Sequence, residues 1–365
     1  MAGISEKDRK GMKQYLLLIA AGEKKDTLSR AMGIFLYFLS LIYSGILILR
    51  LLVYRFGIKS VIRHDIKVIS VGNITVGGTG KTPLVERIAE YLIEEKKRVA
   101  IISRGYKGVQ GRHGFAADEP QMLKNRFPEA QVIINRDRPV ALKLAQDEMG
   151  CEVAVLDDAF GNLKTGKDLD IVCVSCLNPF GFGYVLPRGL LRLPLCYLAN
   201  AQIFMLTHTD QAPGKVEEII NKLRKYNKKA EIFKSSHVPE FLYNVINAQK
   251  RELSYVRDEK VALLCAIAQP ELFNKTVQGL GARITENFYF EDHHAFTNEQ
   301  MQSIIARCLA LKVRSIITTA KDEPRIKAAM TDKQLEVEIL VLKIKLEVEK
   351  NEGRFLERVS ALFTN

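Results

Sequence analysis

The chain has 365 residues, of which 47% are hydrophobic and 26% charged, a balance that is typical of globular domains and excludes large-scale disorder. Its length is enough for two domains. Half of the net charge of +12 falls within residues 1–66, where eleven Lys or Arg oppose five Asp or Glu. Because this basic charge adjoins an apolar run and the chain has no Trp, we expect a membrane surface as partner and no nucleic acid.

The apolar run extends from Ala31 to Leu49 without a formal charge. This length is close to the roughly 20 residues that cross a bilayer core. No small-residue cleavage site follows the run, so a cleavable signal peptide is not expected. We therefore predict a membrane-associated helix at 31–57 after an N-terminal extension at 1–30. The helix either spans the bilayer or lies in one leaflet, and a buried core helix is the alternative.

Apolar strands then alternate with helical patterns, which is typical of a parallel sheet covered on both faces. In the first series we expect strands at 67–72, 98–103, 132–134, 153–156, 171–174 and 203–206, with helices at 83–95, 139–148 and 215–226. A lysine-rich boundary is predicted near 228–240. The second series has strands at 261–265, 284–290, 315–319 and 335–345, with helices at 271–280, 297–311 and 352–363.

The pattern predicts an α/β fold. We expect a P-loop NTPase-type parallel sheet domain at 58–235, a second, smaller α/β domain at 236–365, and the N-terminal membrane-associated helix before them.

The most informative motif lies between the first strand and its helix and comprises Gly77, Gly78, Thr79, Gly80, Lys81 and Thr82. Phosphate binding uses successive backbone N–H groups, a helix N-terminus, a lysine and a hydroxyl for Mg²⁺, all of which this motif supplies. The strict P-loop pattern would have glycine at position 75, where this chain has threonine, so the motif is a variant. It predicts ATP as cofactor.

Asp157 and Asp158 follow the apolar strand at 153–156. P-loop proteins place a carboxylate near Mg²⁺ at the end of such a strand. An ordinary turn after a strand is the alternative, but next to a P-loop the pair predicts a metal site with Thr82.

Four further segments carry weaker signals. Asp118 and His293 lie in Asp-Glu-Pro and Asp-His-His sequences, and a histidine beside a carboxylate can act as a base on a hydroxyl. Arg104 follows a strand at the edge where α/β sheets bind ligands. Arg188 and Arg192 lie in a basic, apolar loop that suits an acylated anionic substrate. Hydrogen-bonded or solvated surface side chains are the alternative interpretation for each.

Residues Val71 to Pro83 closely resemble the signature of the tetraacyldisaccharide 4′-kinase (lipid A 4′-kinase) family. Further segments fall in the order of that family, namely Ser103–Tyr106, Asp118–Pro120, Leu156–Phe160, Leu186–Arg192, Asp292–His293 and Thr318–Asp322. The resemblance covers roughly residues 33–330. It implies a monotopic kinase at the cytoplasmic face of the bacterial inner membrane, which uses MgATP to phosphorylate the 4′-hydroxyl of a tetraacylated glucosamine disaccharide 1-phosphate.

The resemblance also implies a role for each matching residue. Lys81 would hold the β- and γ-phosphates, and Thr82, Asp157 and Asp158 would serve the Mg²⁺ site. Asp118 with His293 would activate the sugar hydroxyl. Arg192 would face substrate or phosphate.

The chain departs from the family pattern at two places. The family usually has Gln-His where this chain has Gly161 and Asn162, and Glu where it has Leu193. Two alternatives therefore stay open. One is a membrane-surface P-loop ATPase of the partitioning or scaffold type, although such proteins favour Lys where this chain has Val76. The other is a degenerate, non-catalytic paralogue of the kinase.

Overall fold

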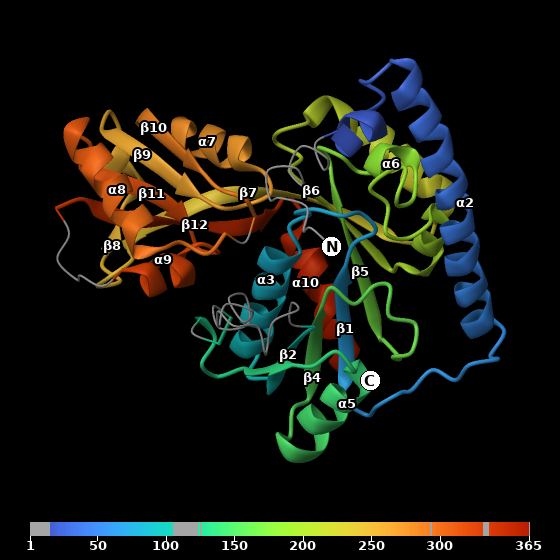
Figure 1. Ribbon diagram of the computed structural model, residues 1–365. Helices are drawn as coiled ribbons and strands as arrows, with labels where there is room; N and C mark the ends of the chain where they lie inside the picture. Colours follow the sequence, from blue (N-terminus) through green and yellow to red (C-terminus); the bar gives the residue numbers. More distant parts are fainter. Residues whose placement is uncertain (1–14, 105–122, 125, 293, 331–335, 365) are drawn as a thin grey trace, which may run out of the picture. The chain divides into compact units, whose positions relative to one another are not determined.

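The computed structural model describes residues 15–104, 123, 124, 126–292, 294–330 and 336–364 (Figure 1). The described residues form two compact units. Unit 1 lies within Met1–Lys81, Val153–Ser236 and Val348–Asn365, and unit 2 within Thr82–Glu152 and His237–Glu347.

The sheet of unit 1 is parallel and has the order β7-β6-β5-β1-β4. Every residue of β4 and β5 is buried, as expected for strands covered on both faces. In this register Val71 of β1 pairs with Asp157 of β4, so the carboxyl ends of the two strands lie together. The strands are β1 (Lys67–Gly72), β4 (Val153–Asp157), β5 (Leu169–Ser175), β6 (Ile203–Thr207) and β7 (Glu231–Asn244).

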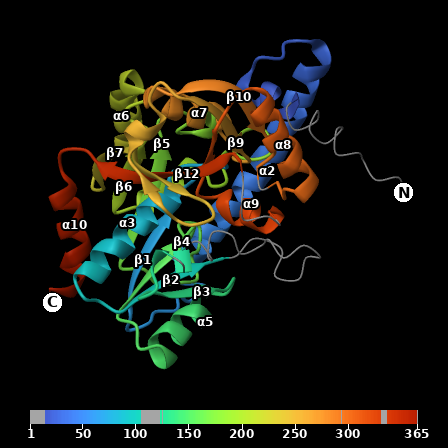
Figure 2. The ribbon, with the colours of Figure 1, turned by 90° about the vertical axis from the view of Figure 1, so that its left-hand side faces the viewer.

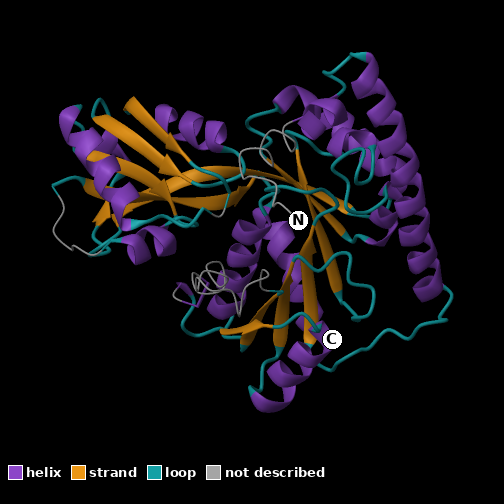
Figure 3. Ribbon diagram, viewed as in Figure 1, coloured by secondary structure: helices purple, strands orange, loops and turns teal. Residues whose placement is uncertain are grey.

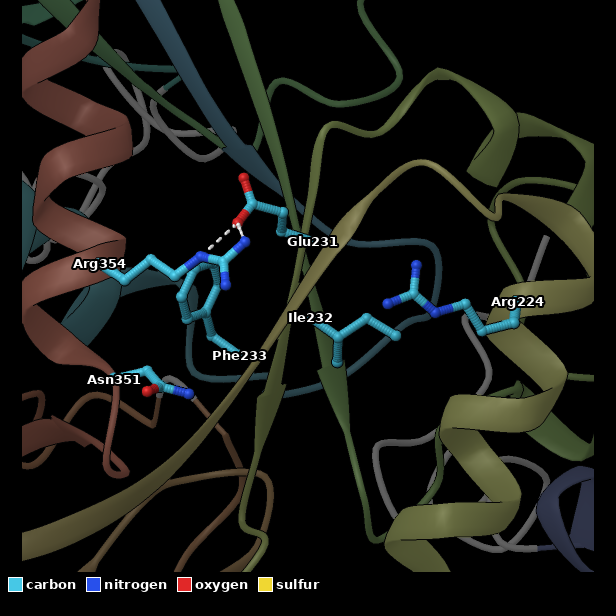
Figure 4. A pocket seen from close by; sticks show the side chains of 6 residues that line it. All are labelled: Arg224, Glu231, Ile232, Phe233, Asn351 and Arg354. Carbon is cyan, nitrogen blue, oxygen red and sulfur yellow. Dashed lines mark hydrogen bonds and ion pairs between the residues drawn. The ribbon is translucent and has the colours of Figure 1, made fainter.

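Helices cover both faces of this sheet because strand side chains alternate in direction. Phe204 and Leu206 of β6 pack in one core cluster with Ile219 and Leu223 of α6 (Val216–Tyr226). The next strand presents Phe233 to the other face, where its ring lies 5.5 Å from that of Phe355 in α10 (Glu352–Ser360). Figure 4 shows α6 and α10 on opposite sides of β7.

The long helix of unit 1 is α2 (Thr27–Arg55), which runs along one side of the unit (Figures 1 and 3). Only a narrow stripe of it is buried, comprising Ser29, Gly33, Leu36, Ser40 and Leu47. The Ser40 hydroxyl donates to the Val185 carbonyl at 2.7 Å, and the Tyr197 hydroxyl donates to the Leu47 carbonyl at 2.7 Å. By length and composition α2 is the one helix of the described residues that could cross a membrane.

Unit 2 contains a second parallel sheet with the order β10-β9-β11-β12. Helices again lie on both faces. Ala262 and Leu264 of β9 pack with α8 and α9, whereas Val261 and Leu263 pack with α7. The elements are β9 (Lys260–Cys265), α7 (Pro270–Gly279), β10 (Arg283–Tyr289), α8 (Asn298–Ala310), β11 (Ser315–Thr319), α9 (Glu323–Ala329) and β12 (Glu338–Val348).

The same unit includes the elements that follow the glycine motif, of which α3, β2 and β3 are drawn in cyan and teal in Figure 2. They are α3 (Lys81–Glu94), β2 (Val99–Ser103), the parallel β3 (Gln131–Ile134) and α5 (Arg138–Lys143). On α3, the Glu86 carboxylate lies 2.9 Å from the ammonium of Lys343 and 3.2 Å from the guanidinium of Arg126. Glu86 and Lys343 are both buried.

One local expectation differs from the structure. The helix predicted at 139–148 changes from α to π geometry at Leu144–Glu148, a change that apolar spacing does not reveal. The region of the boundary predicted near 228–240 contains β7, a single strand of 14 residues, and the two units divide between Ser236 and His237 of this strand. The second part of β7 pairs antiparallel with β8 (Lys250–Arg251) in unit 2. The α/β class itself is confirmed.

Candidate nucleotide-binding site

The glycine motif forms a tight loop between β1 and α3. Gly77 and Gly80 have φ angles of 115° and 76°. Residues other than glycine rarely adopt such positive φ angles, because their Cβ clashes with the backbone. Gly77 and Gly78 are exposed, and a Cβ at either would meet nothing within 4 Å. α3 begins at Lys81, and Thr82 is its second residue. The loop therefore presents open backbone and a helix N-terminus, which together suit a phosphate.

Buried side chains hold the loop in this shape. The Asn73 amide donates to the Thr75 carbonyl at 2.9 Å and to the Thr79 hydroxyl at 2.8 Å. From the end of β6, the Thr207 hydroxyl donates to the Thr79 carbonyl at 3.1 Å. Asn73, Thr79 and Thr207 are all buried, so the loop is preorganised. Sequence analysis did not single out Asn73 or Thr207, although Asn73 directly follows the first strand.

Asp157 and Asp158 lie at the carboxyl end of β4 but have different surroundings. Asp157 is the last residue of the strand and is 6% exposed. Asp158 has a φ angle of 53°, a left-handed conformation that a residue other than glycine adopts at a cost. Its carboxylate is half-buried and receives two hydrogen bonds, 2.9 and 2.7 Å long, from Arg192. The Lys81 ammonium lies 3.8 Å from the same carboxylate.

Arg192 also joins the loop at 185–192 to residues 73–76, which lead into the glycine motif. Its guanidinium donates to the Asn73 side-chain oxygen, and its backbone N–H donates to the Ile74 carbonyl at 2.7 Å. Beside it, the Val76 N–H donates to the Leu190 carbonyl at 2.8 Å. Lys81, Asp158 and Arg192 thus form one cluster with two cations and one anion. Its surplus positive charge suits a phosphate group.

The residues expected to hold Mg²⁺ offer the hard oxygen donors that this ion prefers, a carboxylate from Asp157 and a hydroxyl from Thr82. Mg²⁺ usually takes one or two carboxylates plus phosphate oxygens and water. The described residues contain no group of three or more His, Cys, Asp or Glu that could hold a metal. This donor set fits an ion that arrives with the nucleotide, and the second carboxylate, Asp158, is hydrogen-bonded to Arg192.

Arg188 has partners outside this cluster. The Arg188 guanidinium donates to the carbonyls of Ile19 and Ala20 at 2.9 and 3.3 Å. Arg104 is exposed and follows β2 in unit 2. Asp118 and His293 fall outside the described residues, so their predicted role as a base stays a prediction.

The two departures from the family pattern lie next to each other. A Cβ added at Gly161 would lie 3.3 and 3.4 Å from the two terminal methyl carbons of Leu193. Leu193 is buried, and its backbone N–H donates to the Ile74 carbonyl. The adjacent Asn162 side chain accepts a hydrogen bond of 3.1 Å from the Lys164 N–H. An apolar contact therefore occupies the place where the family pattern has polar side chains.

A separate pocket of unit 1 is lined by residues of β7, α6 and α10 and by Asn351 (Figure 4). Its volume of 150 Å³ is too small for a nucleotide. Glu231 within it pairs with Arg354 at 2.8 Å and with Arg358 at 2.6 Å. It contains no residue of the glycine motif and is lined by Arg224, Glu231, Ile232, Phe233, Asn351 and Arg354.

Comparisons with known proteins agree with the motif order. The sequence model of the tetraacyldisaccharide-1-P 4′-kinase family matches residues 32–363. A tetraacyldisaccharide 4′-kinase from Anaeromyxobacter sp. (strain K) is 33% identical over 296 residues, which are 77% of this chain and 78% of the relative. One from Elusimicrobium minutum is 32% identical over 349 residues, covering 91% and 92% of the two chains.

Among solved structures, LpxK from Aquifex aeolicus in complex with ATP has a TM-score of 0.69 and 26% identity, and the match covers 88% of this chain and 97% of that one. The family match extends over both the glycine motif and the C-terminal sheet. The chain belongs to the tetraacyldisaccharide-1-P 4′-kinase family.

Proposed function

We propose that this protein transfers the γ-phosphate of ATP to the 4′-hydroxyl of tetraacyldisaccharide 1-phosphate, a step of lipid A biosynthesis. The observation that carries the proposal is the cluster in which Asp158 holds Lys81 and Arg192 beside the glycine motif. Its two cations lie where a P-loop protein stabilises the phosphates of a nucleotide. The family membership supplies the acceptor.

In the proposed reaction the backbone N–H groups from Gly77 to Gly80 bind the phosphates, and Lys81 neutralises the charge that develops on the transferred group. Arg192 stabilises either that group or the acidic head of the acceptor. Asp158 holds both cations in place before the nucleotide binds. Phosphate oxygens would compete with the Asp158 carboxylate for these cations and so release it.

Thr82, Asp157 and Asp158 are proposed to hold Mg²⁺, which neutralises the β- and γ-phosphate charge when bound. Asp118 with His293 is proposed to take the proton of the attacking hydroxyl. Arg104 is proposed to contact substrate. Arg188 is proposed to serve the same substrate site.

The acceptor is a lipid, so we propose that unit 1 works at a membrane surface, at the cytoplasmic face of the bacterial inner membrane. Large apolar side chains are exposed along α2, among them Leu28, Phe35, Phe38, Ile42, Ile46 and Leu49. Ser40 and Leu47 tie the opposite side of the helix to the body of the unit. A helix held along its length in this way favours insertion into one leaflet over a span.

A lipid kinase assay tests the function. The protein is incubated with Mg²⁺, ATP labelled on the γ-phosphate and tetraacyldisaccharide 1-phosphate in detergent micelles, and label in the lipid is measured. We expect transfer that falls at least about 10³-fold in Lys81→Ala, because the charge on the transferred phosphate loses its partner. Lys225→Ala, an exposed lysine of α6, is the matched control and should retain activity.

Two other outcomes would point elsewhere. Release of phosphate without labelled lipid would indicate a membrane-surface ATPase. ATP binding with no turnover on any lipid acceptor would indicate a non-catalytic paralogue.

A further inference from the structure

Residues 15–25 precede the part of the chain that matches the family, yet they are folded onto it. Residues 15–21 are helical, and Gly22 ends the helix with a φ angle of 76°. Backbone hydrogen bonds from Gly22 to Ile19 and from Glu23 to Leu18 close the turn at 3.1 and 3.0 Å. Asp26 then caps α2 through the Ser29 N–H. The segment therefore forms a short helix, the first arm, which a turn joins to α2, the second arm.

Side chains fix these two arms to each other. The Tyr15 hydroxyl lies 2.7 Å from the Ser29 hydroxyl. Ile19 is 3% exposed, and a Cβ added at Gly33 of α2 would lie 3.6 Å from its methyl carbon. Because Gly33 has no side chain, the first arm can approach α2 closely at this point.

The carboxyl end of the first arm holds Arg188 of the loop at 185–192. Its guanidinium donates to the carbonyls of Ile19 and Ala20, which lie in the last turn of the helix. A cation is favoured there because the last carbonyls of a helix carry partial negative charge. The guanidinium also lies 4.9 Å from the centre of the Tyr184 ring, a cation–π contact from the same loop.

The loop that carries Arg188 is fastened at both ends. At one end the Ser40 hydroxyl of α2 accepts from the Arg188 N–H at 2.9 Å and donates to the Val185 carbonyl. At the other end Leu190 and Arg192 bond to Val76 and Ile74, which precede the glycine motif. A shift of Arg188 would therefore be transmitted along four residues to Arg192. The glycine motif is held by Asn73, which itself accepts from Arg192, and from β6 by Thr207.

We propose that residues 15–25 are a positioning segment for the acceptor site, and that Arg188 is the positioning residue through which they act. The segment fixes the loop at 185–192 so that Arg192 meets the acidic head of the lipid. ATP binding should depend on it less than lipid binding does, because Thr207 of β6 holds the glycine motif from another element. This inference rests on the proposed kinase function.

Two truncations and one substitution test the proposal. One truncation removes residues 2–25 and keeps the Asp26 cap, and the matched control removes only residues 2–14. Arg188→Ala is combined with each. In the lipid kinase assay we expect the long truncation and Arg188→Ala each to raise KM for the lipid about 10-fold, with KM for ATP changed less than about 2-fold. The long truncation with Arg188→Ala should be no worse than either change alone.

Three results would overturn the proposal. Multiplied losses in the combined variant would mean that the segment acts without Arg188, for example by touching the membrane itself. A raised KM for ATP would place the effect at the glycine motif. An equal effect of the short truncation would exclude residues 15–25 as the cause.

Hydrogen exchange gives a readout that needs no catalysis, so it remains valid if the proposed kinase function fails. In the long truncation the Arg188 amide, which bonds to Ser40, should exchange at least about 10-fold faster. The Cys176 amide, which bonds to the Thr207 carbonyl at the end of β6, is the internal reference and should keep its rate. Unchanged exchange at Arg188 would contradict the proposal.

Discussion

Two carboxylates in this protein each hold two cations, and they differ in burial. Glu86 of unit 2 is 6% exposed and lies between Lys343 and Arg126. The Asp158 side chain of unit 1 is 32% exposed and lies between Lys81 and Arg192, whose side chains are 18% and 35% exposed. Lys343 is buried together with Glu86, and Arg126 also pairs with Glu90 at 3.9 Å, whereas the charges beside Asp158 can be reached by a phosphate. The same arrangement therefore stabilises the fold in one unit and prepares a binding site in the other.

The largest effect on stability is expected from breaking the buried cluster. Glu86→Leu leaves the Lys343 charge buried without its carboxylate, so we expect the free energy of unfolding to fall by about 3–5 kcal/mol. Urea unfolding followed by circular dichroism measures this change. Glu86→Leu combined with Lys343→Met removes both charges and should recover most of the loss. A double variant as unstable as Glu86→Leu would mean that the loss comes from packing.

Asp158→Asn should lower phosphate transfer much more than it lowers the free energy of unfolding. The pair is partly exposed, so its loss should change the free energy of unfolding by less than about 1 kcal/mol. Phosphate transfer should fall about 10²- to 10³-fold, because Lys81 and Arg192 lose the group that fixes their positions. The two quantities are measured on the same preparation. A variant that unfolds easily but transfers normally would assign Asp158 to the fold.

Sequence patterns predicted the elements of this site better than its contacts. The strand at 67–72 and the glycine motif were recognisable because buried parallel strands are continuously apolar and phosphate loops need glycine. Asp157 and Asp158 were found for the same reason, since they end such a strand. The contacts of Asp158 with Arg192, by contrast, join residues 34 apart in the sequence, and only the folded chain reveals them.

Other features depend on still more distant partners. Arg188 finds the Ile19 carbonyl 169 residues earlier in the chain, and no periodicity encodes that pairing. Asn73 supports the glycine motif through its side-chain amide, and this role cannot be predicted from an asparagine in a loop sequence. The lysine-rich pattern at 228–240 does not reveal that β7 runs through this region as one strand, because β-sheet pairing depends mainly on tertiary context.

A smaller effect is expected at the apolar contact of Gly161 and Leu193, beside the exposed cluster. Gly161→Gln adds a side chain against the Leu193 methyl groups, and Leu193→Glu places a carboxylate in a buried position. Each single change should lower the free energy of unfolding by about 1–3 kcal/mol. In the double variant the amide can donate to the carboxylate, so a favourable coupling of at least about 0.5 kcal/mol is expected from a double-mutant cycle. Strict additivity would show that the two positions are independent departures.

The smallest expected effect is on the pH dependence of stability, through the buried His208 that follows β6. Burial lowers the pKa of the His208 imidazole below its ordinary value, although Asp210 opposes the shift, and Nδ1 of the ring lies 3.2 Å from the Ser175 hydroxyl. The unfolded chain therefore binds a proton as pH falls through about 6.5, while the folded chain does not, so stability declines below that pH.

One such proton changes stability by at most about 1.4 kcal/mol per pH unit. His208→Asn keeps a residue that tolerates the φ angle of 58° but cannot titrate, so urea unfolding between pH 5 and 7.5 should become flatter by this amount. Asp158→Asn should keep the slope of the unmodified protein across the same range, because this variant retains the His208 imidazole. An unchanged slope in His208→Asn would assign the pH dependence to another group. A flatter slope would show that His208, next to the Thr207 that supports the glycine motif, causes the loss of stability at low pH.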